Sequence, residues 1–343
     1  MKFELKQPPH ALPATSVPKV MLQVIYALVP AALAHVWFFG WGICINALIA
    51  ALAALGSEAF MLRLRGRPIR PALLDGTATV TAVLLAFAIP PLAPWWVPVI
   101  GAVTAMVLAK HLYGGMGSNL FNPAMVGYAI LLISFPVEMT YWLPPRGAEL
   151  GLPAIGAWDS LRFALTGSLP QALDIDAVTQ ATPLDLVREG LTSMRTVAEV
   201  QAGPLFGGMG GQGWEWVNGL IAIGGFYLLF RGIIRWHIPV SMLAAMMIAA
   251  AVFHAFDASL YASASFHLFS GASLLGAFFI ATDPVSAATT NRGRLIYGAG
   301  IGILTYAIRT WGGYPDGVAF AVLLMNATVP LLDRYTRPRI YGR

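Results

Sequence analysis

The sequence predicts an all-α polytopic membrane protein, with about ten transmembrane helices in two inverted five-helix repeats. Hydrophobic residues make up 57% of the 343 residues and charged residues only 11%, and the mean hydropathy is +0.69. Soluble globular proteins carry about 25% charged residues, so this chain cannot cover a water-facing surface. The composition therefore excludes a soluble enzyme, a secreted disulfide scaffold, a disordered protein and a nucleic-acid binder.

Ten apolar segments are candidates to cross a bilayer core of about 30 Å, which takes about 20 helical residues. Several are short or contain Pro and Gly, but their length and continuity favour helices over the strands of a barrel. The predicted spans are 20–39, 41–62, 76–93, 95–113, 122–135, 214–230, 238–256, 266–282, 295–311 and 314–332.

The chain has one cysteine, Cys44, inside the second predicted span. A single cysteine excludes an internal disulfide, and the chain lacks the cysteines of an iron–sulfur cluster and any CxxCH haem site. We expect a buried and unreactive thiol. Redox chemistry in this protein would therefore need an organic cofactor or a cluster shared with another protein.

The Lys and Arg residues indicate the orientation. With the N-terminus in the cytoplasm, 16 of the 21 Lys and Arg residues fall on the cytoplasmic side, as the positive-inside rule requires. Both termini are therefore predicted to be cytoplasmic, and the long loop 136–213 to be periplasmic. The sixteen residues are Lys2, Lys6, Lys19, Arg63, Arg65, Arg67, Arg70, Lys110, Arg231, Arg235, Arg292, Arg294, Arg334, Arg337, Arg339 and Arg343.

The third and eighth spans begin with similar sequences, Leu74-Asp75-Gly76-Thr77-Ala78 and Phe269-Ser270-Gly271-Ala272-Ser273. The two copies are five spans apart. Because five is an odd number, they cross the membrane in opposite directions, which is the pattern of inverted repeats in transporters. The predicted division is an N-terminal half, 1–135, a loop, 136–213, and a C-terminal half, 214–343.

The loop 136–213 is acidic. With four arginines its formal charge is −4, which leaves +9 for the rest of the chain and accounts for the net charge of +5. Loops of this length are usually functional or disordered; we expect an ordered one, with helices over 161–173 and 183–200. Its acidic residues, eight of the sixteen in the chain, are Glu138, Glu149, Asp159, Asp174, Asp176, Asp185, Glu189 and Glu199.

A motif within this loop carries a specific chemical signal. The residues Asp176-Ala177-Val178-Thr179-Gln180-Ala181-Thr182 match the pattern Asp-x-x-Thr-x-Ala-Thr. This pattern resembles the recognition sequence of a flavin transferase that esterifies FMN, through its phosphate, to the last threonine. The resemblance implies covalent FMN on Thr182, with Asp176, Thr179 and Ala181 read by the transferase. On the residues alone, Thr182 could instead cap a helix that starts at Pro183.

The placement of this motif between the fifth and sixth of ten spans extends the resemblance to nearly the whole chain. The chain resembles the family that contains the RnfD component of the Rnf complex, an ion-translocating ferredoxin:NAD⁺ oxidoreductase, and the NqrB component of the sodium-pumping NADH:quinone reductase. The segments Ser118-Asn119-Leu120-Phe121-Asn122-Pro123-Ala124 and Ala281-Thr282-Asp283-Pro284-Val285-Ser286 also carry it.

The resemblance implies a bacterial inner-membrane subunit that relays electrons, coupled to Na⁺ or H⁺ movement, and is not catalytic alone. The implied partners are Rnf-type subunits A, B, C, E and G, the flavin transferase during maturation, and the lipid bilayer. The family also implies a second, noncovalent flavin such as riboflavin. No catalytic residue is assigned, because the flavin itself would carry the electrons.

Two other classes of function stay open on the residues alone. Ten spans in inverted halves equally suit a cofactor-free channel or secondary transporter, and a purely structural membrane subunit is a further alternative. Ionisable residues in or beside spans are candidates for function: Glu58, Asp75, Lys110, His35, His254, Asp257, His267, Asp283 and Asp316. The histidines are expected to be neutral and hydrogen-bonded, and because no pair has metal-ligand spacing we predict no metal site.

Overall fold

The computed structural model describes residues 16–148, 155–169, 175–314 and 316–337. Within these residues every regular element is a helix, and the only β-type pairing is an isolated bridge between Phe206 and Gly211. The predicted fold class, an all-α polytopic membrane protein, is therefore confirmed. Lys2, Lys6, Glu149, Asp174, Arg339 and Arg343 lie outside the described residues.

The helices of the N-terminal half follow the first five predicted spans. Pro90 and Pro91 end the third of these early, because proline lacks the backbone donor that a helix needs. The elements are α1 (Val17–Phe39), α2 (Gly42–Leu64), α3 (Ile69–Leu73), α4 (Thr77–Ala88), α5 (Trp96–Thr104), which continues as the π-helical segment η1 (Ala105–His111), and α6 (Pro123–Ser134).

The C-terminal half contains the other membrane helices. They are α11 (Trp214–Phe230), α12 (His237–Phe256), α13 (Ala264–Phe269), α14 (Ser273–Leu275), which continues as the π-helical segment η4 (Gly276–Ile280), α15 (Asn291–Trp311) and α16 (Val318–Tyr335). In the described residues α1, α2, the segment Ile69–Ala88, α12 and α16 are long and apolar enough to cross a membrane, and shorter apolar helices accompany them.

The eighth predicted span, 266–282, is not one continuous helix, so this prediction was wrong. The chain leaves the helix after α13, passes through Ser270, Gly271 and Ala272, and starts again at α14. Gly271 has φ +63°, a left-handed conformation that breaks a helix and that glycine adopts readily.

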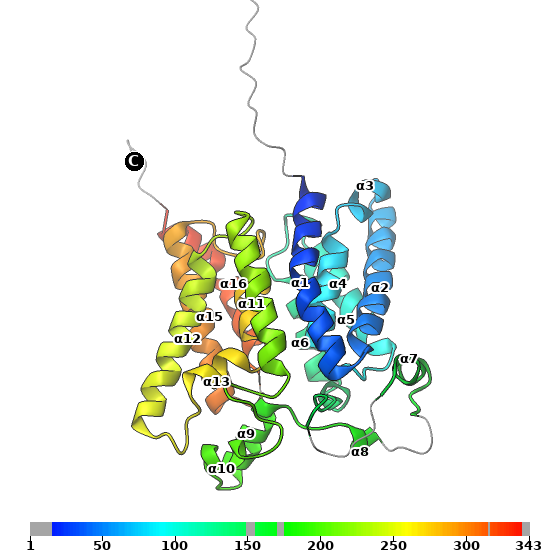
Figure 1. The fold of residues 1–343 in the computed structure, drawn as a ribbon. Helices are drawn as coiled ribbons and strands as arrows, with labels where there is room; N and C mark the ends of the chain where they lie inside the picture. Colours follow the sequence, from blue (N-terminus) through cyan, green and yellow to red (C-terminus); the bar gives the residue numbers. More distant parts are fainter. Residues whose placement is uncertain (1–15, 149–154, 170–174, 315, 338–343) are drawn as a thin grey trace, which may run out of the picture.

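In the other half a similar interruption lies at the start of the third predicted span, where Leu74, Asp75 and Gly76 separate α3 from α4. In Figure 1, α3 lies at the end of the molecule where α1 begins, whereas α13 lies near the opposite end. The two interrupted helices therefore occur at opposite ends of the molecule, at the two positions where the sequences are similar.

The two halves pack side by side. In Figure 1, α1 to α6 occupy one side and α11 to α16 the other, with α1 lying beside α11. A Cβ on Gly224 of α11 would lie 2.1 Å from the carbonyl oxygen of Ala27 in α1, so the missing side chain lets these helices approach closely. Asn122 adds a polar link, because its backbone N–H donates to Asn326 Oδ1 and its side chain to the Ile280 carbonyl. The division into domains at 135 and 213 stays a prediction.

The loop 136–213 lies at the end of the molecule opposite the beginning of α1 and the end of α16 (Figure 1). Its helices are η2 (Glu138–Thr140), α7 (Ala157–Thr166), α8 (Ile175–Val178), α9 (Pro183–Thr192) and α10 (Val197–Gln201). The two helices predicted over 161–173 and 183–200 were partly wrong. The first begins earlier and ends at Gly167, which has φ +69°, and the second is divided where Met194 has φ +61° and Thr196 starts a new capped helix.

The prediction of a buried thiol was also wrong, because Cys44 is exposed on α2. In a span of apolar residues the sequence does not distinguish a side chain that faces neighbouring helices from one that faces lipid, so burial could not be inferred from the apolar run. This thiol lines a shallow apolar recess with Val29 and Phe87.

Candidate functional site

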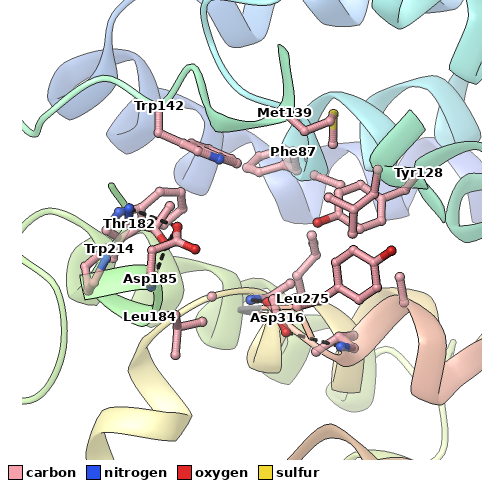
Figure 2. Close-up of a pocket in the computed structure, with 18 of the residues that line it drawn as sticks. Phe87, Tyr128, Met139, Trp142, Thr182, Leu184, Asp185, Trp214, Leu275 and Asp316 are labelled. Atoms are coloured by element: carbon pink, nitrogen blue, oxygen red, sulfur yellow. Dashed lines mark hydrogen bonds between the residues drawn. The ribbon is translucent and has the colours of Figure 1, made fainter. Parts of the chain in front are cut away.

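A cavity of about 320 Å³ lies where the two halves meet the loop. Its size falls in the range of small-molecule sites, roughly 300–1,000 Å³. The walls come from α1, α4, α6, α11, α14, η4 and α16, and the start of α9 closes one side. Figure 2 shows side chains from both halves and from the loop pointing into this space. A single ligand here would contact all three parts of the chain.

Aromatic rings form much of the cavity wall, including Phe87, Tyr128, Trp142, Trp214 and Tyr314. The rings of Trp142 and Trp214 lie 5.1 Å apart at 65°, and both lie close to Thr182 in Figure 2. Aromatic faces and edges bind flat apolar rings well, because such pairs add to the free energy gained by burial alone. The cavity is therefore suited to a planar, largely apolar ligand.

Thr182 lies in the cavity wall and also lines a smaller recess with Gln180, Ala181 and Gln212. It is the N-cap of α9, with φ −66° and ψ 160°. Its Oγ1 accepts a hydrogen bond from the Asp185 backbone N–H at 3.3 Å, and its own N–H donates to Asp185 Oδ2 at 3.2 Å. The capping role that the sequence left open is thus present, with Pro183 at the first helical position.

The Thr182 hydroxyl has a second, shorter contact: Oγ1 donates to Asp185 Oδ2 at 2.5 Å (Figure 2). Burial raises the pKa of the Asp185 carboxyl above its usual value, and the nearby Asp316 carboxylate acts in the same direction. Hydrogen bonds from Thr182 and the charge of Arg188 oppose this shift without cancelling it. The hydroxyl therefore faces a carboxyl that takes up a proton more readily than a solvated one.

The start of α9 also gives the cavity edge a favourable field for an anion. The backbone N–H groups in the first turn of a helix lack partners within the helix and carry a partial positive charge. Phosphate groups bind at such helix ends for this reason. Because Thr182 is the residue immediately before the first turn, a phosphate esterified to its Oγ1 would lie next to this charge.

Asp316 fixes the opposite wall of the cavity, at the break between α13 and α14. Its carboxylate accepts a hydrogen bond from the backbone N–H of Ala272 at 2.7 Å and forms an ion pair with Arg309 at 3.1 Å. Arg309 in turn donates to the carbonyl oxygens of His267 at 2.7 Å and Ser270 at 3.2 Å. These contacts satisfy the free ends of the broken helix without a ligand.

Of the other motif residues, Ala181 lines the smaller recess with Thr182, and Thr179 lines neither the recess nor the cavity. Asp176 belongs to α8, and its side chain is outside the described part of the structure. Thr179 Oγ1 donates to the Ile175 carbonyl at 3.0 Å, and the Gln180 N–H donates to the Trp142 carbonyl at 2.8 Å. The structure thus brings Thr182 and Ala181 to the recess, while Thr179 stabilises the turn that precedes them.

Asp185, Trp142 and Trp214 were not predicted from the sequence to be site residues. A signal for Asp185 exists in the sequence, because Thr182 and Asp185 have the spacing of a capping box. The tryptophans carry no such signal, since residues distant in the sequence meet only in the folded chain. Among the described residues no group of three or more His, Cys, Asp and Glu could hold a metal ion.

Of the predicted histidines, His254 has the expected hydrogen bond, and its charge stays a prediction. His254 Nδ1 contacts the Tyr261 carbonyl at 2.7 Å. His35 is buried in the cavity wall, and the described residues make no hydrogen bond to either of its ring nitrogens. Its ring instead lies 6.1 Å from the rings of Phe87 and Trp214, edge to face.

The helical membrane fold and this cavity define the class: a polytopic membrane protein with a cavity of small-molecule size between two helical halves and the loop 136–213. Comparison with known proteins is more specific. The chain belongs to the NQR2, RnfD, RnfE family, whose sequence profile matches residues 4–342.

Similar proteins cover the chain from end to end. The D subunit of the ion-translocating oxidoreductase complex of Aliivibrio salmonicida (strain LFI1238) is 52% identical, with 100% of this chain and 99% of that protein aligned. The protein of the same name from Aeromonas hydrophila is 51% identical, over 99% of both chains. The one from Escherichia fergusonii is 49% identical, over 100% of this chain and 99% of its own length.

Proposed function

We propose that the protein is the D subunit of an ion-translocating oxidoreductase complex in the bacterial inner membrane, carrying covalent FMN on Thr182 and relaying electrons coupled to Na⁺ or H⁺ transport. The observation that carries the cofactor assignment is the position of Thr182. Its hydroxyl lies in the wall of an aromatic cavity of about 320 Å³, at the start of α9. Full-length similarity to proteins with this name supports the assignment to the complex.

The residues around Thr182 fit such a group. When bound, FMN supplies a ring system that accepts and donates electrons one or two at a time. The ester to Thr182 would keep the flavin in place without taking part in electron transfer. Trp142, Trp214 and Tyr128 offer aromatic surface to the flavin ring, while the first turn of α9 favours the phosphate charge.

Asp185 is the carboxyl in contact with Thr182, and it could oppose a phosphate there. A charged carboxylate beside a phosphate anion is destabilising. Because burial raises the pKa of Asp185, protonating this carboxyl costs less than protonating a solvated one, and protonation would remove the repulsion. The Thr182 hydroxyl gives up its hydrogen bond to Asp185 when Oγ1 is esterified, so the side chain of Asp185 becomes available to donate to the phosphate.

The partners and the orientation belong to the same proposal. Rnf-type subunits A, B, C, E and G would supply the other redox centres, and a flavin transferase would attach the FMN. Under the positive-inside rule the loop lies in the periplasm and both termini in the cytoplasm. Noncovalent riboflavin stays a prediction with no residue assigned to it.

A cofactor-free channel or secondary transporter is the alternative function that a specific observation favours. Interrupted helices at opposite ends of two packed halves, with a cavity between the halves, resemble the architecture of such transporters. This alternative gives Thr182 only its capping role. The two proposals therefore differ in whether the Thr182 hydroxyl carries a covalent bond.

The test distinguishes the loss of the Thr182 hydroxyl from the loss of the N-cap of α9. The full chain is made together with the flavin transferase, denatured, and examined for flavin fluorescence in the gel. Thr182→Ala removes both the hydroxyl and the cap, which costs about 1 kcal/mol of stability. Thr182→Asn keeps a good N-cap but has no hydroxyl to esterify, whereas Thr182→Ser keeps both.

We expect fluorescence from the wild type, none from the Ala and Asn variants, and recovery of some or all of the signal in the Ser variant. Fluorescence that survives in Thr182→Asn would place the attachment elsewhere. A wild-type band without flavin would overturn the covalent FMN proposal and favour the channel or transporter.

A further inference from the structure

A second cavity lies where the loop covers the C-terminal half, apart from the cavity that contains Thr182. Its volume is about 340 Å³, which falls in the range of small-molecule sites. The walls come from α9, the turn between α12 and α13, α13 itself and the end of α15. Leu184 is the only residue of α9 that lines both cavities. The proposed flavin site therefore does not account for this second space.

The walls of the second cavity are fixed by packing between the loop and the C-terminal half. The buried side chains of Leu184, Val187 and Phe266 belong to one apolar cluster that joins α9 to α13. The backbone N–H of Val197, at the start of α10, donates to the Ser259 carbonyl in the turn after α12 at 2.9 Å. In Figure 1, α9 and α10 lie below α13, at the end of the molecule where α12 ends. The loop is thus held over the ends of these helices.

Two arginines and no carboxylate are the charged side chains that line this cavity. Arg309 forms an ion pair with Asp316 at 3.1 Å. Arg188 of α9 is half-buried and forms no ion pair with any of the described residues. Because an arginine keeps its proton in proteins and offers five N–H donors, Arg188 leaves the cavity with a positive charge that has no paired anion.

The carboxylates on the surrounding elements have other partners. Asp185, one turn earlier in α9, attracts Arg188 from a distance but accepts its hydrogen bonds from Thr182. Asp257, in the turn after α12, accepts from the backbone and side chain of Ser259. Charges exposed to solvent are screened by salt, and the remaining charged residues of α9, α10 and the turn between them are exposed: Glu189, Arg195 and Glu199.

His267 adds a buried polar atom to the same cavity. The residue is 6% exposed, and its Nδ1 has no hydrogen-bond partner among the described residues. Leaving a buried polar atom unpaired is costly. A neutral imidazole with its proton on Nδ1 can donate to an ester or phosphate oxygen, so a ligand with such oxygens would satisfy this atom without any change in the charge of His267.

The rim of the cavity is apolar and lies at the ends of two membrane helices. Leu260 and Trp311 line the cavity and are 52% and 57% exposed. Trp311 ends α15, and its ring lies 5.0 Å from that of Phe253 and 5.9 Å from that of Tyr306. Tryptophans at the ends of membrane helices lie at the level of the lipid headgroups. The cavity therefore opens toward lipid, where α12 and α15 leave the membrane.

We propose that this second cavity binds the headgroup of an anionic phospholipid. Arg188 pairs with the phosphate, as guanidinium and phosphate groups do with two parallel hydrogen bonds, and His267 Nδ1 donates to an oxygen of the headgroup or of an acyl ester. The acyl chains leave past Leu260 and Trp311 into the bilayer. No carboxylate lines the cavity to receive the cation of a zwitterionic lipid, so the preferred lipid is anionic. The site depends neither on FMN nor on which side of the membrane the loop faces.

The experiment measures how brominated phospholipids quench the fluorescence of Trp311. The full chain is placed in phosphatidylcholine vesicles that contain increasing fractions of either brominated phosphatidylglycerol, which is anionic, or brominated phosphatidylcholine. The difference between wild type and Trp311→Phe isolates the Trp311 signal. We expect half-quenching at a several-fold lower fraction of the brominated phosphatidylglycerol. Equal quenching by the two lipids would overturn the proposal.

Variants of Arg188 test the contact with the phosphate. Arg188→Gln removes the charge and should abolish the preference for phosphatidylglycerol. Arg188→Lys keeps the charge and should retain part of the preference, which also covers a Gln variant that does not fold. Arg162→Gln is the matched control, because it makes the same change at an exposed residue of α7 that does not line this cavity, and it should keep the preference. A full preference in folded Arg188→Gln would contradict the assignment.

His267→Phe tests the second contact. Phenylalanine keeps a flat ring against Tyr306, which lies 5.1 Å from the His267 ring, but it has no donor. Quenching by both brominated lipids should then need a higher lipid fraction, because both lipids carry the same ester and phosphate oxygens. Quenching curves that match those of the wild type would remove His267 from the site.

Inorganic phosphate distinguishes a lipid headgroup from a free anion. With a fixed fraction of brominated phosphatidylglycerol in the vesicles, sodium chloride is exchanged for sodium phosphate at constant ionic strength. A lipid site should keep Trp311 quenched, because the acyl chains hold the headgroup beside the cavity. Recovery of the fluorescence in phosphate would mean that the cavity takes a free phosphate, and the assignment to a lipid would be wrong.

Discussion

Thr182 and Asp185 form a capping box, in which the side chain of each residue accepts a hydrogen bond from the backbone N–H of the other. The sequence predicted Thr182 from its motif, and it predicted the capping alternative from the Pro183 that follows. It did not predict that the same hydroxyl would face a half-buried carboxyl near a second carboxylate, because Asp316 and the walls of the cavity are distant in the sequence. A local pattern can define a cap, but only the folded chain determines the charge state around it.

The pKa of Asp185 predicts how pH changes stability. Because burial raises this pKa in the folded state, the carboxyl contributes stability that is fully present below its unfolded pKa, ordinarily near 3.8. This contribution is lost as the pH rises through the folded pKa. In Asp185→Asn the side-chain oxygen can still accept from Thr182, but it does not titrate. We therefore expect the Tm of the wild type in detergent to fall relative to that of Asp185→Asn as the pH rises above about 4.

Parallel pH profiles for the two proteins would contradict this prediction. Glu199→Gln is a useful control, since the Thr196 cap lowers the pKa of that exposed carboxyl. A lowered pKa gives the opposite sign: the stability from Glu199 is present above its unfolded pKa and is lost as the pH falls through the folded pKa.

The interrupted helices are the elements that the sequence described only in part. The similarity of Leu74-Asp75-Gly76 and Ser270-Gly271-Ala272 predicted that these positions correspond, but it did not predict a break, and the eighth span, 266–282, was predicted to be continuous. Hydropathy indicates whether a segment is apolar enough to lie in a bilayer, and the segments on both sides of a helix break are apolar enough. The break becomes stable through Arg309 and Asp316, which satisfy its free backbone groups from a part of the chain that hydropathy cannot relate to it.

Substitution of Gly271 tests the break directly. Gly271 has φ +63°, and a Cβ there would lie 2.5 Å from Asp316 Oδ2 and 2.8 Å from Arg309 Nη2. The left-handed conformation alone costs a residue with a side chain roughly 1–2 kcal/mol, and the displaced ion pair adds to this cost. We expect Gly271→Ala to lower the Tm in detergent, and to lower flavin loading because Gly271 also lines the cavity.

Gly219→Ala in α11 is the matched control, because a Cβ at this position meets no atom within 4 Å. Alanine is favoured over glycine in a helix by up to about 1 kcal/mol, so this variant should be as stable as the wild type or more so. Equal Tm values for Gly271→Ala and the wild type would show that the left-handed turn is not required.

At the scale of the whole molecule, composition and hydropathy predicted the class, the positions of most spans and the acidic loop. They could not predict which residues of the two halves and the loop would meet. Thr182, Trp214 and Asp316 come from three separate segments and line one cavity, and the largest cluster of buried apolar side chains draws on both halves. These contacts depend on how the halves pack. The inverted repeat predicted only that the two halves pair. The family resemblance predicted the cofactor but not the residues that surround it.

The distribution of charged residues predicts which side of the membrane the loop 136–213 faces, and the proposed function depends on that side. The beginning of α1 and the end of α16 lie at one end, and the loop lies at the other (Figure 1). The basic residues cluster at the first end and the acidic residues in the loop, so the positive-inside rule predicts a periplasmic loop. Flavin attachment at Thr182 would then occur on the periplasmic side of the membrane.

Single cysteines test this orientation in a Cys44→Ser background, which is needed because Cys44 is exposed. Ser193→Cys places a thiol on the exposed surface of the loop, and Thr289→Cys places one on the exposed turn before α15. In intact spheroplasts a membrane-impermeant maleimide should label Ser193→Cys and spare Thr289→Cys, and after permeabilisation it should label both. Labelling of Thr289→Cys alone before permeabilisation would invert the molecule. Thr182 would then face the cytoplasm, and its modification would require a transferase on that side.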